Sequence, residues 1–288
     1  MLALWGQRMI RQVLPTPKVL SEEQTELFRE NGHLYPFDGI GADEAAALCA
    51  DLETYEKTQG HNATAIITKS HLLFSRAFAF TRRAAILDAV EDLIGPDILI
   101  FSSRFWIKPG CDGSYVSWHQ DSAYFGLEPN ELVTVWLALT DSTIENGCLR
   151  VIPRTHLGET YSHDETPDEK NLLARSQSIE EIDDSGAVDL KLKAGQFSIH
   201  HERLVHGSLP NETDSPRIGL GMFFMPTHVR STLDRRFADL ARGTDTYRHW
   251  DHDPTPETAS AKEVAAHVEA AGRRYIDPNF AQETILAH

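Results

Sequence analysis

The chain is poor in cysteine, with only Cys49, Cys111 and Cys148 among its 288 residues. An odd number of cysteines without metal-type pairing argues against a disulfide framework and for a reducing compartment. The sequence also lacks an apolar run long enough to span a membrane, and no charged-then-apolar leader opens it. We therefore expect a cytoplasmic protein with no membrane partner.

Basic residues are also scarce, since 27 Lys and Arg stand against 43 Asp and Glu, for a net charge of −16. The short pairs Arg82-Arg83, Arg235-Arg236 and Arg273-Arg274 are far apart and form no basic stripe, so nucleic-acid binding is not expected. An acidic surface repels anions such as a coenzyme A thioester and modestly favours a neutral or cationic small molecule, although a local pocket can oppose it. The sequence carries no signal of oligomeric state.

Histidine is plentiful, and two of the 14 histidines form the most informative pattern together with one carboxylate. His119 and Asp121 are two positions apart, so in a β-strand they point to one face while Gln120 turns away. His206, far along the chain, can supply a third ligand from another strand. Two imidazoles and one carboxylate leave half of an octahedral ferrous ion open for chemistry. Taken alone, however, His-x-Asp also occurs by chance on protein surfaces.

Arg217 opens a strand-like run that continues to Met225. On this strand Arg217, Gly219 and Gly221 share one face, so we expect no bulk beside the guanidinium. Interior strand glycines often mark the close approach of a ligand. A fixed fork of donors next to an empty space suits a carboxylate.

Hydrophobic patterning predicts helices first and strands later. Ser21 with Gln24 forms a capping-box pattern, and Gly32 ends that helix. Further helices are expected over about 42–57, 81–94 and 259–274. The candidate strands are 98–101, 105–107, 132–140, 149–152, 188–192, 197–200 and 218–224. Their number and spacing predict a mainly β fold with flanking helices and a double-stranded β-helix (jelly-roll, cupin-like) core.

Two segments interrupt or link these strands. Asn146-Gly147 lies between two β-rich runs and is a strong hairpin signal. Residues 159–186 are acidic and poor in strand patterns, and long loops in compact domains are usually functional or disordered. We expect this segment to be a lid over the substrate, with a plain surface insertion as the alternative.

Three longer motifs contain the candidate metal ligands and the Asn146-Gly147 pair. They are His-Gln-Asp-Ser-Ala-Tyr-Phe-Gly at 119–126, Glu-Asn-Gly-Cys-Leu-Arg-Val-Ile-Pro-Arg-Thr-His at 145–156, and Val-His-Gly-Ser at 205–208 with Arg217. Together they resemble the phytanoyl-CoA dioxygenase (PhyH) family of iron(II)/2-oxoglutarate oxygenases. The resemblance runs from about Leu20 to about Arg230, and the opening 20–32 is similar to the way members of that family begin.

The chain is expected to contain an N-terminal arm over 1–19, one jelly-roll oxygenase domain over 20–233, and a C-terminal helical extension over 234–288 packed on the domain or on a partner subunit. The resemblance implies a role for several residues. It makes three residues the iron ligands and the catalytic centre: His119, Asp121 and His206. It makes Arg217 and Ser208 the contacts of the distal carboxylate of 2-oxoglutarate.

Other residues have weaker implied roles. Trp136 matches a tryptophan that lines the cosubstrate pocket, and ordinary core packing is the equal alternative. Lys69 and His71 correspond to positions near cosubstrate or substrate, against the simpler interpretation of solvated loop residues. Arg104 is a candidate substrate contact or a rim ion pair. His200-His201 is interpreted as structural, because adjacent strand residues face opposite ways and at most one can face the metal.

The implied cofactors are Fe(II), 2-oxoglutarate and dioxygen, with 2-oxoglutarate decarboxylated to succinate. The expected reaction is hydroxylation of a small polar metabolite or natural-product intermediate, with desaturation or oxidative cyclisation as other outcomes. Asp121 favours a hydroxylase over a halogenase, because halogenating relatives carry a small residue there. The alternative is a non-redox metal-binding jelly-roll protein, such as a hydrolase, isomerase or sensor. Arg217 and Ser208 argue against it, because a hydrolase needs no second carboxylate clamp.

Overall fold

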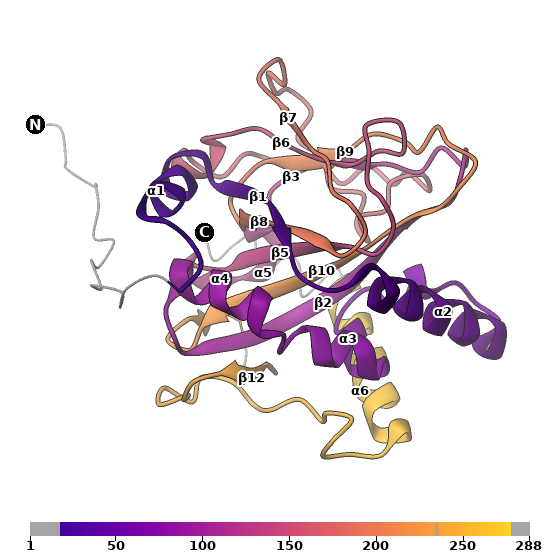
Figure 1. Ribbon diagram of the computed structural model, residues 1–288, viewed down its shortest axis with the longest axis vertical. Coiled ribbons are helices and arrows are strands. Elements are labelled where there is room, and N and C mark those ends of the chain that lie inside the picture. The colour runs from indigo at the N-terminus through magenta and orange to yellow at the C-terminus, as the bar shows by residue number, and fades with distance from the viewer. Residues whose placement is uncertain (1–17, 234–235, 278–288) are drawn as a thin grey trace, which may run out of the picture.

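The fold is a jelly roll of two facing antiparallel sheets with helices along the larger one (Figure 1). The computed structural model describes residues 18–233 and 236–277. In spatial order the larger sheet contains β1 (His33–Asp38), β8 (Gln196–His201), β5 (Val133–Ala138), β10 (Arg217–Pro226), β2 (Ile98–Lys108) and β12 (Asp239–Arg242). The smaller sheet contains β3 (Val116–His119), β9 (His206–Ser208), β6 (Leu149–Val151) and β7 (Val188–Leu190). The short strands β4 (Leu127–Glu128) and β11 (Arg230–Ser231) pair with each other. The predicted fold class is confirmed.

Five helices within the described residues cover the outer face of the larger sheet (Figure 1): α1 (Glu22–Asn31), α2 (Ala42–Gln59), α3 (Ser75–Phe80), α4 (Ala84–Ile94) and α6 (Ala261–Ile276). The short helix α5 (Ser122–Phe125) follows β3 instead, and short 3₁₀ turns form η1 (Ala63–Ala65), η2 (Ser70–Leu73) and η3 (Thr155–Leu157). The predicted capping box of α1 is present, and Gly32 ends the helix at φ 78°. The helix predicted from Thr81 is wrong at its start, because Thr81 ends α3 and α4 begins at Ala84.

Strand alternation on β2 separates the core from the interior of the jelly roll. Phe105 and Ile107 pack into the hydrophobic core with the helices. Arg104, Trp106 and Lys108 take the other face, and Arg104 and Lys108 are both buried. A buried strand that alternates large apolar residues with cations is not built for packing alone, because charged side chains are seldom buried without a partner.

The predicted Asn146-Gly147 hairpin is wrong, because the strands it was to join lie in different sheets. A turn does form, and the amide of Cys148 donates to the carbonyl of Thr143. Both edges of β5 are already paired, with β8 and β10, so β6 has no edge of β5 to join. The turn instead carries the chain from the larger sheet to the smaller one.

The segments outside the predicted strands also contribute to the fold. Residues 159–186 contain an isolated bridge between Asp164 and Ser178, and their lid role stays a prediction. Within the predicted C-terminal extension, β12 joins the larger sheet and α6 packs on the body through Val264 and Val268. The predicted arm lies outside the described residues up to position 17, as does the tail from 278. Of the helices in the described ranges, none is long and apolar enough to cross a membrane.

Candidate metal centre

Three predicted ligands converge between the two sheets. His119 ends β3 and is the cross-strand partner of His206 on β9. Asp121 follows directly, and its Oδ1 lies 3.6 Å from Nε2 of His119 and 4.0 Å from Nε2 of His206. One ligand atom from each residue lies within 4.8 Å of the other two, and all three residues are buried. The cluster therefore has the size of a metal site.

The reason for this convergence differs from the prediction. β3 stops at His119, and Asp121 has helical angles, φ −59° and ψ −39°, at the start of α5. The turn of the chain into α5, not strand alternation, brings the carboxylate to the imidazoles. Gln120 does turn away, as expected, because its side-chain amide donates to the carbonyl of Arg203.

Backbone carbonyls fix both imidazoles for metal binding. Nδ1 of His119 lies 2.9 Å from the carbonyl of Ser117, and Nδ1 of His206 lies 2.9 Å from that of Leu204. Since a carbonyl only accepts, both Nδ1 atoms carry the proton and both Nε2 lone pairs face Asp121. Nε2 of His119 is buried without a hydrogen-bond partner among the described residues.

The charges at the cluster match those of metal ligands. Burial raises the pKa of Asp121, but His206 and His119 outweigh it and lower this pKa to about 2. Burial lowers the pKa of His206 to about 4. At neutral pH the carboxylate is therefore ionised and the His206 imidazole is neutral, which are the states that bind a cation. The hydroxyl of Thr134 donates to Oδ2 of Asp121 at 3.1 Å and holds the carboxylate in place.

Beside the cluster lie two buried basic side chains. Arg217 and Lys108 are direct cross-strand partners, and their exposed fractions are 2% and 0%. Arg217 Nη2 donates to the carbonyl of Gly147 at 3.0 Å, and Lys108 Nζ donates to Oγ of Ser208 at 2.6 Å. In residues 18–233 and 236–277 no carboxylate forms a salt bridge with either, and Nε of Arg217 has no partner. Burial and the nearby Arg217 lower the pKa of Lys108 to about 6.

Lys108 is a residue that the sequence interpretation missed. No motif marks it, because its inward orientation follows from the register of β2 in the larger sheet. Like charges buried side by side are unfavourable unless an anion joins them. Lys108, Arg217 and Ser208 thus form a receptor for an anionic group next to the metal cluster.

The expectation of empty space beside Arg217 is wrong. A Cβ on Gly219 would lie 2.1 Å from Cζ2 of Trp136, and one on Gly221 would lie 2.9 Å from Nε1 of Trp106. The two strand glycines therefore make room for indole rings. The guanidinium of Arg217 lies 5.2 Å from the ring of Trp136, which fixes the fork in a cation–π contact.

His200 also faces this pocket, although it was interpreted as structural. Its ring lies 4.5 Å from that of His206, and neither ring nitrogen has a partner in the described part of the chain. His201 points the other way, and its Nδ1 accepts from the amide of Arg203. Alternation correctly limited the pair to one inward histidine, but the pattern could not say which one.

Lys69 and His71 are not brought to the metal cluster. The ammonium of Lys69 lies 2.8 Å from Asp253 in a buried ion pair. His71 is buried on the helical side, where its Nδ1 bonds to Oγ of Ser103. Neither residue is solvated, so the simpler alternative is wrong, and Lys69 lines a cavity beside α6. Arg104 does border the site, since it lines a cavity together with Asp121.

The fold and the cluster define a jelly-roll protein with a two-histidine, one-carboxylate centre and an adjoining anion receptor. The profile of the phytanoyl-CoA dioxygenase (PhyH) family matches residues 28–219. Because the match covers most of the chain, the protein belongs to the phytanoyl-CoA dioxygenase family.

Individual relatives share parts of the chain. The probable alpha-ketoglutarate-dependent hypophosphite dioxygenase of Stutzerimonas stutzeri is 29% identical over 59% of this chain and 61% of its own. The peroxisomal phytanoyl-CoA dioxygenase of Rattus norvegicus is 27% identical over 69% of this chain and 66% of its own. The chain thus spans less than two thirds of these curated relatives. The solved structure of the non-heme monooxygenase ThoJ is 33% identical, with a TM-score of 0.78 over 92% of this chain and 99% of that one.

Proposed function

We propose that the protein is an Fe(II)/2-oxoglutarate-dependent oxygenase that hydroxylates a small organic molecule. The observation that carries the proposal is the pairing of an oriented two-histidine, one-carboxylate cluster with two buried basic side chains, Arg217 and Lys108, that have no carboxylate partner in the described residues. A metal site alone fits many reactions, whereas an adjoining receptor for a second carboxylate fits a diacid cosubstrate. The similarity to an alpha-ketoglutarate-dependent dioxygenase supports this choice.

In this proposal His119, Asp121 and His206 hold the metal on one side and leave the other side open. The carbonyls of Ser117 and Leu204 keep both imidazoles turned toward the ion. When bound, ferrous iron with 2-oxoglutarate and dioxygen supplies the oxidising chemistry, and 2-oxoglutarate leaves as succinate. The protein positions these groups and needs no side-chain acid or base for hydrogen abstraction.

Arg217, Ser208 and Lys108 would bind the distal carboxylate of 2-oxoglutarate. Nε of Arg217 has no partner in the described residues and can donate to the carboxylate. The hydroxyl of Ser208 is held in place by a hydrogen bond from Nζ of Lys108. Trp136 would line the cosubstrate pocket and hold Arg217 by its ring face. A bound carboxylate would pair with Arg217 and would favour the protonated form of Lys108, because an opposite charge nearby raises the pKa of an amine.

Hydroxylation is the proposed outcome within this reaction class. The carboxylate of Asp121 would occupy the coordination position that a halogenase leaves for a halide. Desaturation and cyclisation depend on the substrate, and a small polar metabolite or natural-product intermediate is the proposed class.

Succinate release from 2-oxoglutarate tests the proposal without knowledge of the substrate. The full chain is incubated under air with ferrous iron and 2-oxoglutarate, and succinate is measured by mass spectrometry. We expect slow release that requires iron and is lost in His206→Ala. Absence of release with iron, combined with a metal-dependent activity supported by zinc, would identify the non-redox alternative.

A further inference from the structure

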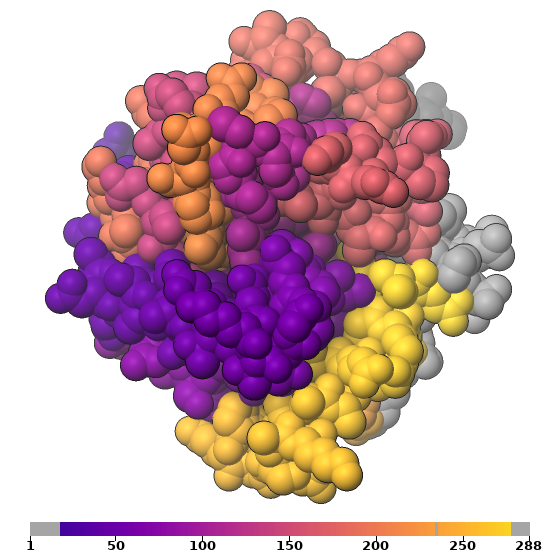
Figure 2. Space-filling view, turned by 90° about the vertical axis from the view of Figure 1, so that its right-hand side faces the viewer, coloured from indigo at the N-terminus to yellow at the C-terminus, as the bar shows by residue number. Residues whose placement is uncertain are grey.

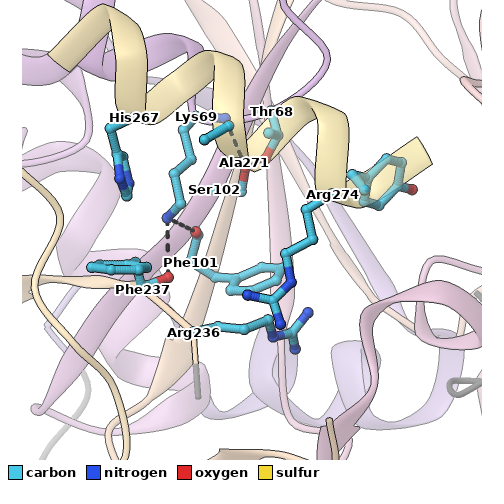
Figure 3. A pocket seen from close by; sticks show the side chains of 11 residues that line it. Thr68, Lys69, Phe101, Ser102, Arg236, Phe237, His267, Ala271 and Arg274 are labelled. Carbon is cyan, nitrogen blue, oxygen red and sulfur yellow. Dashed lines mark hydrogen bonds between the residues drawn. The ribbon is translucent and has the colours of Figure 1, made fainter. Parts of the chain in front are cut away.

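We propose that the substrate of this oxygenase carries an anionic group, a carboxylate or a phosphate, which is held by Arg104 and Arg236. The inference rests on the proposed function and deepens it, since it names the substrate class. The site is a cavity beside α6 (Figure 3) together with an adjoining inner cavity that Asp121 lines.

The cavity has an outer and an inner part that share lining residues. The outer part, of about 170 Å³, lies under α6, whose residues Ala271, Arg274 and Tyr275 line it (Figure 3). The inner part is lined by Arg104 and by Asp121, so it reaches the metal cluster. The two parts adjoin each other, because both are lined by Thr68, Phe101, Ser102, Arg236 and Tyr275.

Surface packing also places α6 at the mouth of this cavity. On the face shown in Figure 2 the yellow C-terminal segment lies against the N-terminal helices and borders the segment that precedes β7. From that segment, Leu173 and Gln177 line the inner part. The cavity is thus enclosed by elements from three distant parts of the chain, and Asp121 of the metal cluster borders its inner part.

Two arginines in this cavity lack an acidic partner. Arg104 is 8% exposed, and its Nη2 donates to the carbonyl of Leu172 at 2.8 Å. The guanidinium of Arg236 donates to the carbonyls of Phe125 and Gly126. Within the described ranges no salt bridge involves either residue, and both Nε atoms are buried without a partner. Burial lowers the pKa of each to about 10, which still leaves both charged at neutral pH.

The carboxylates near the cavity already have other partners or an assigned role. Asp253 is paired with Lys69, and Glu165 is paired with Arg175. Asp121 lines the inner part, but the proposed function assigns it to the metal. A buried guanidinium without a counter-charge is unfavourable, so an incoming anion gains from both arginines.

The aromatic walls exclude a cation as the alternative occupant. The guanidinium of Arg104 lies 4.5 Å from the ring of Trp106, and that of Arg236 lies 5.1 Å from the ring of Phe101. These ring faces attract positive charge, but the protein's own cations occupy them. A cationic ligand would meet two guanidinium groups, whereas an anion would meet two planar forks that its geometry matches.

Of the two arginines proposed to hold the anionic group, Arg236 lies outside the residues that match the family. The family profile ends at residue 219, while Arg236 and all of α6 follow it. The apolar atoms of Phe101, Phe125 and Phe223 complete the walls. The proposed substrate therefore has an anionic head and an apolar body that reaches toward the metal.

Binding of head-group variants tests the inference. Phenylbutyrate, phenylbutyl phosphate, phenylbutanol and phenylbutylamine are titrated into the full chain by calorimetry. We expect an anionic probe to bind about tenfold or more tightly than the alcohol, and the amine to bind most weakly. The better of the two anionic probes identifies a carboxylate or a phosphate as the head group. Equal binding of all four, preference for the amine, or no binding of either anion overturns the inference.

Arginine-to-glutamine variants show which residues bind the anionic group of the probe. Arg236 lies in an irregular segment and Arg104 lies in β2. Each of the substitutions Arg236→Gln and Arg104→Gln is expected to remove the preference for the anionic probe. Arg76→Gln is the matched control, because Arg76 is an exposed arginine paired with Asp51 on the surface. If Arg217→Gln removes the preference and Arg236→Gln retains it, the probe sits in the cosubstrate receptor and the inference is wrong. Because these titrations use neither iron nor turnover, their failure is distinct from a failure of the succinate assay.

Discussion

At the scale of single residues, the buried charged side chains differ in whether another side chain of opposite charge is paired with them. Lys69 and Asp253 neutralise each other in the core, so they do not await a ligand. Arg217 lowers the pKa of its neighbour Lys108, and neither residue has a carboxylate partner in the described residues. The difference separates a structural ion pair from a receptor, although sequence resemblance alone had placed Lys69 at the cosubstrate.

The substitution Arg217→Gln should weaken the binding of 2-oxoglutarate without weakening the binding of the metal. Loss of a charge-assisted hydrogen bond in a buried receptor removes about 2 kcal/mol, or roughly thirtyfold in affinity. Calorimetric titration of the zinc-loaded chain with 2-oxoglutarate measures the change. Arg76→Gln serves as the control, and unchanged affinity in Arg217→Gln would remove Arg217 from the cosubstrate site.

Lys108 should make the stability depend on pH. Its folded-state pKa is about 6, against a usual value of 10.5, so between these values the unfolded chain binds more protons. The free energy of unfolding therefore rises with pH across this window, by up to about 1.4 kcal/mol per pH unit. Lys108→Met should lack this contribution in urea unfolding curves collected across the window. Equal slopes for the two proteins would show that Lys108 keeps its proton in the fold.

At the scale of elements, local signals were reliable and pairing was not. The capping box of α1 needs only Ser21 and Gln24, and the structure contains it. The partner of a strand depends on which sheet edges are free, so Asn146-Gly147 indicated a turn but could not indicate that β6 joins the other sheet. The break between α3 and α4 at Arg82 and Arg83 interrupts no hydrophobic pattern, and the sequence did not predict it.

The same limit applies to the site. His119, Asp121, His206 and Arg217 belong to recognisable motifs, so the amino-acid sequence alone is enough to predict them. His200 and Lys108 belong to no such motif, and their inward orientation follows from the register of β8 and β2 within the larger sheet. The residues of α6 that line the cavity, such as Arg274, are placed there by tertiary packing alone, which the sequence pattern does not indicate.

Gly219→Ala should disturb β10 and the cosubstrate receptor together. The new Cβ would meet the indole of Trp136 at 2.1 Å, so the ring that holds Arg217 has to move. Overpacking of this kind costs about 1–3 kcal/mol of stability. Chemical unfolding and 2-oxoglutarate titration measure both effects.

Gly186→Ala is the matched control for this substitution. No atom lies within 4 Å of a Cβ added there, so stability should stay unchanged or rise slightly. If Gly219→Ala matched Gly186→Ala in stability and in 2-oxoglutarate affinity, Trp136 would have no part in holding the receptor.

At the scale of the whole molecule, surface and interior carry opposite charge. The net charge of −16 favoured a neutral or cationic substrate, while the cavity presents Arg104, Arg236 and Arg274 to its occupant. A long-range field governs encounter, but a buried site selects by local contacts, where screening by water is weak. Net charge is therefore a poor guide to the substrate of an enclosed cavity.

Anaerobic visible spectroscopy tests the central claim most directly, because a ferrous ion chelated by an α-keto acid absorbs visible light. The full chain is mixed with ferrous iron and 2-oxoglutarate without dioxygen, and the spectrum is compared with that of His206→Ala. We predict a visible band that needs both iron and 2-oxoglutarate and disappears in the variant. No band in the unaltered protein, or an equal band in His206→Ala, would contradict a metal held by His119, Asp121 and His206 beside a cosubstrate receptor.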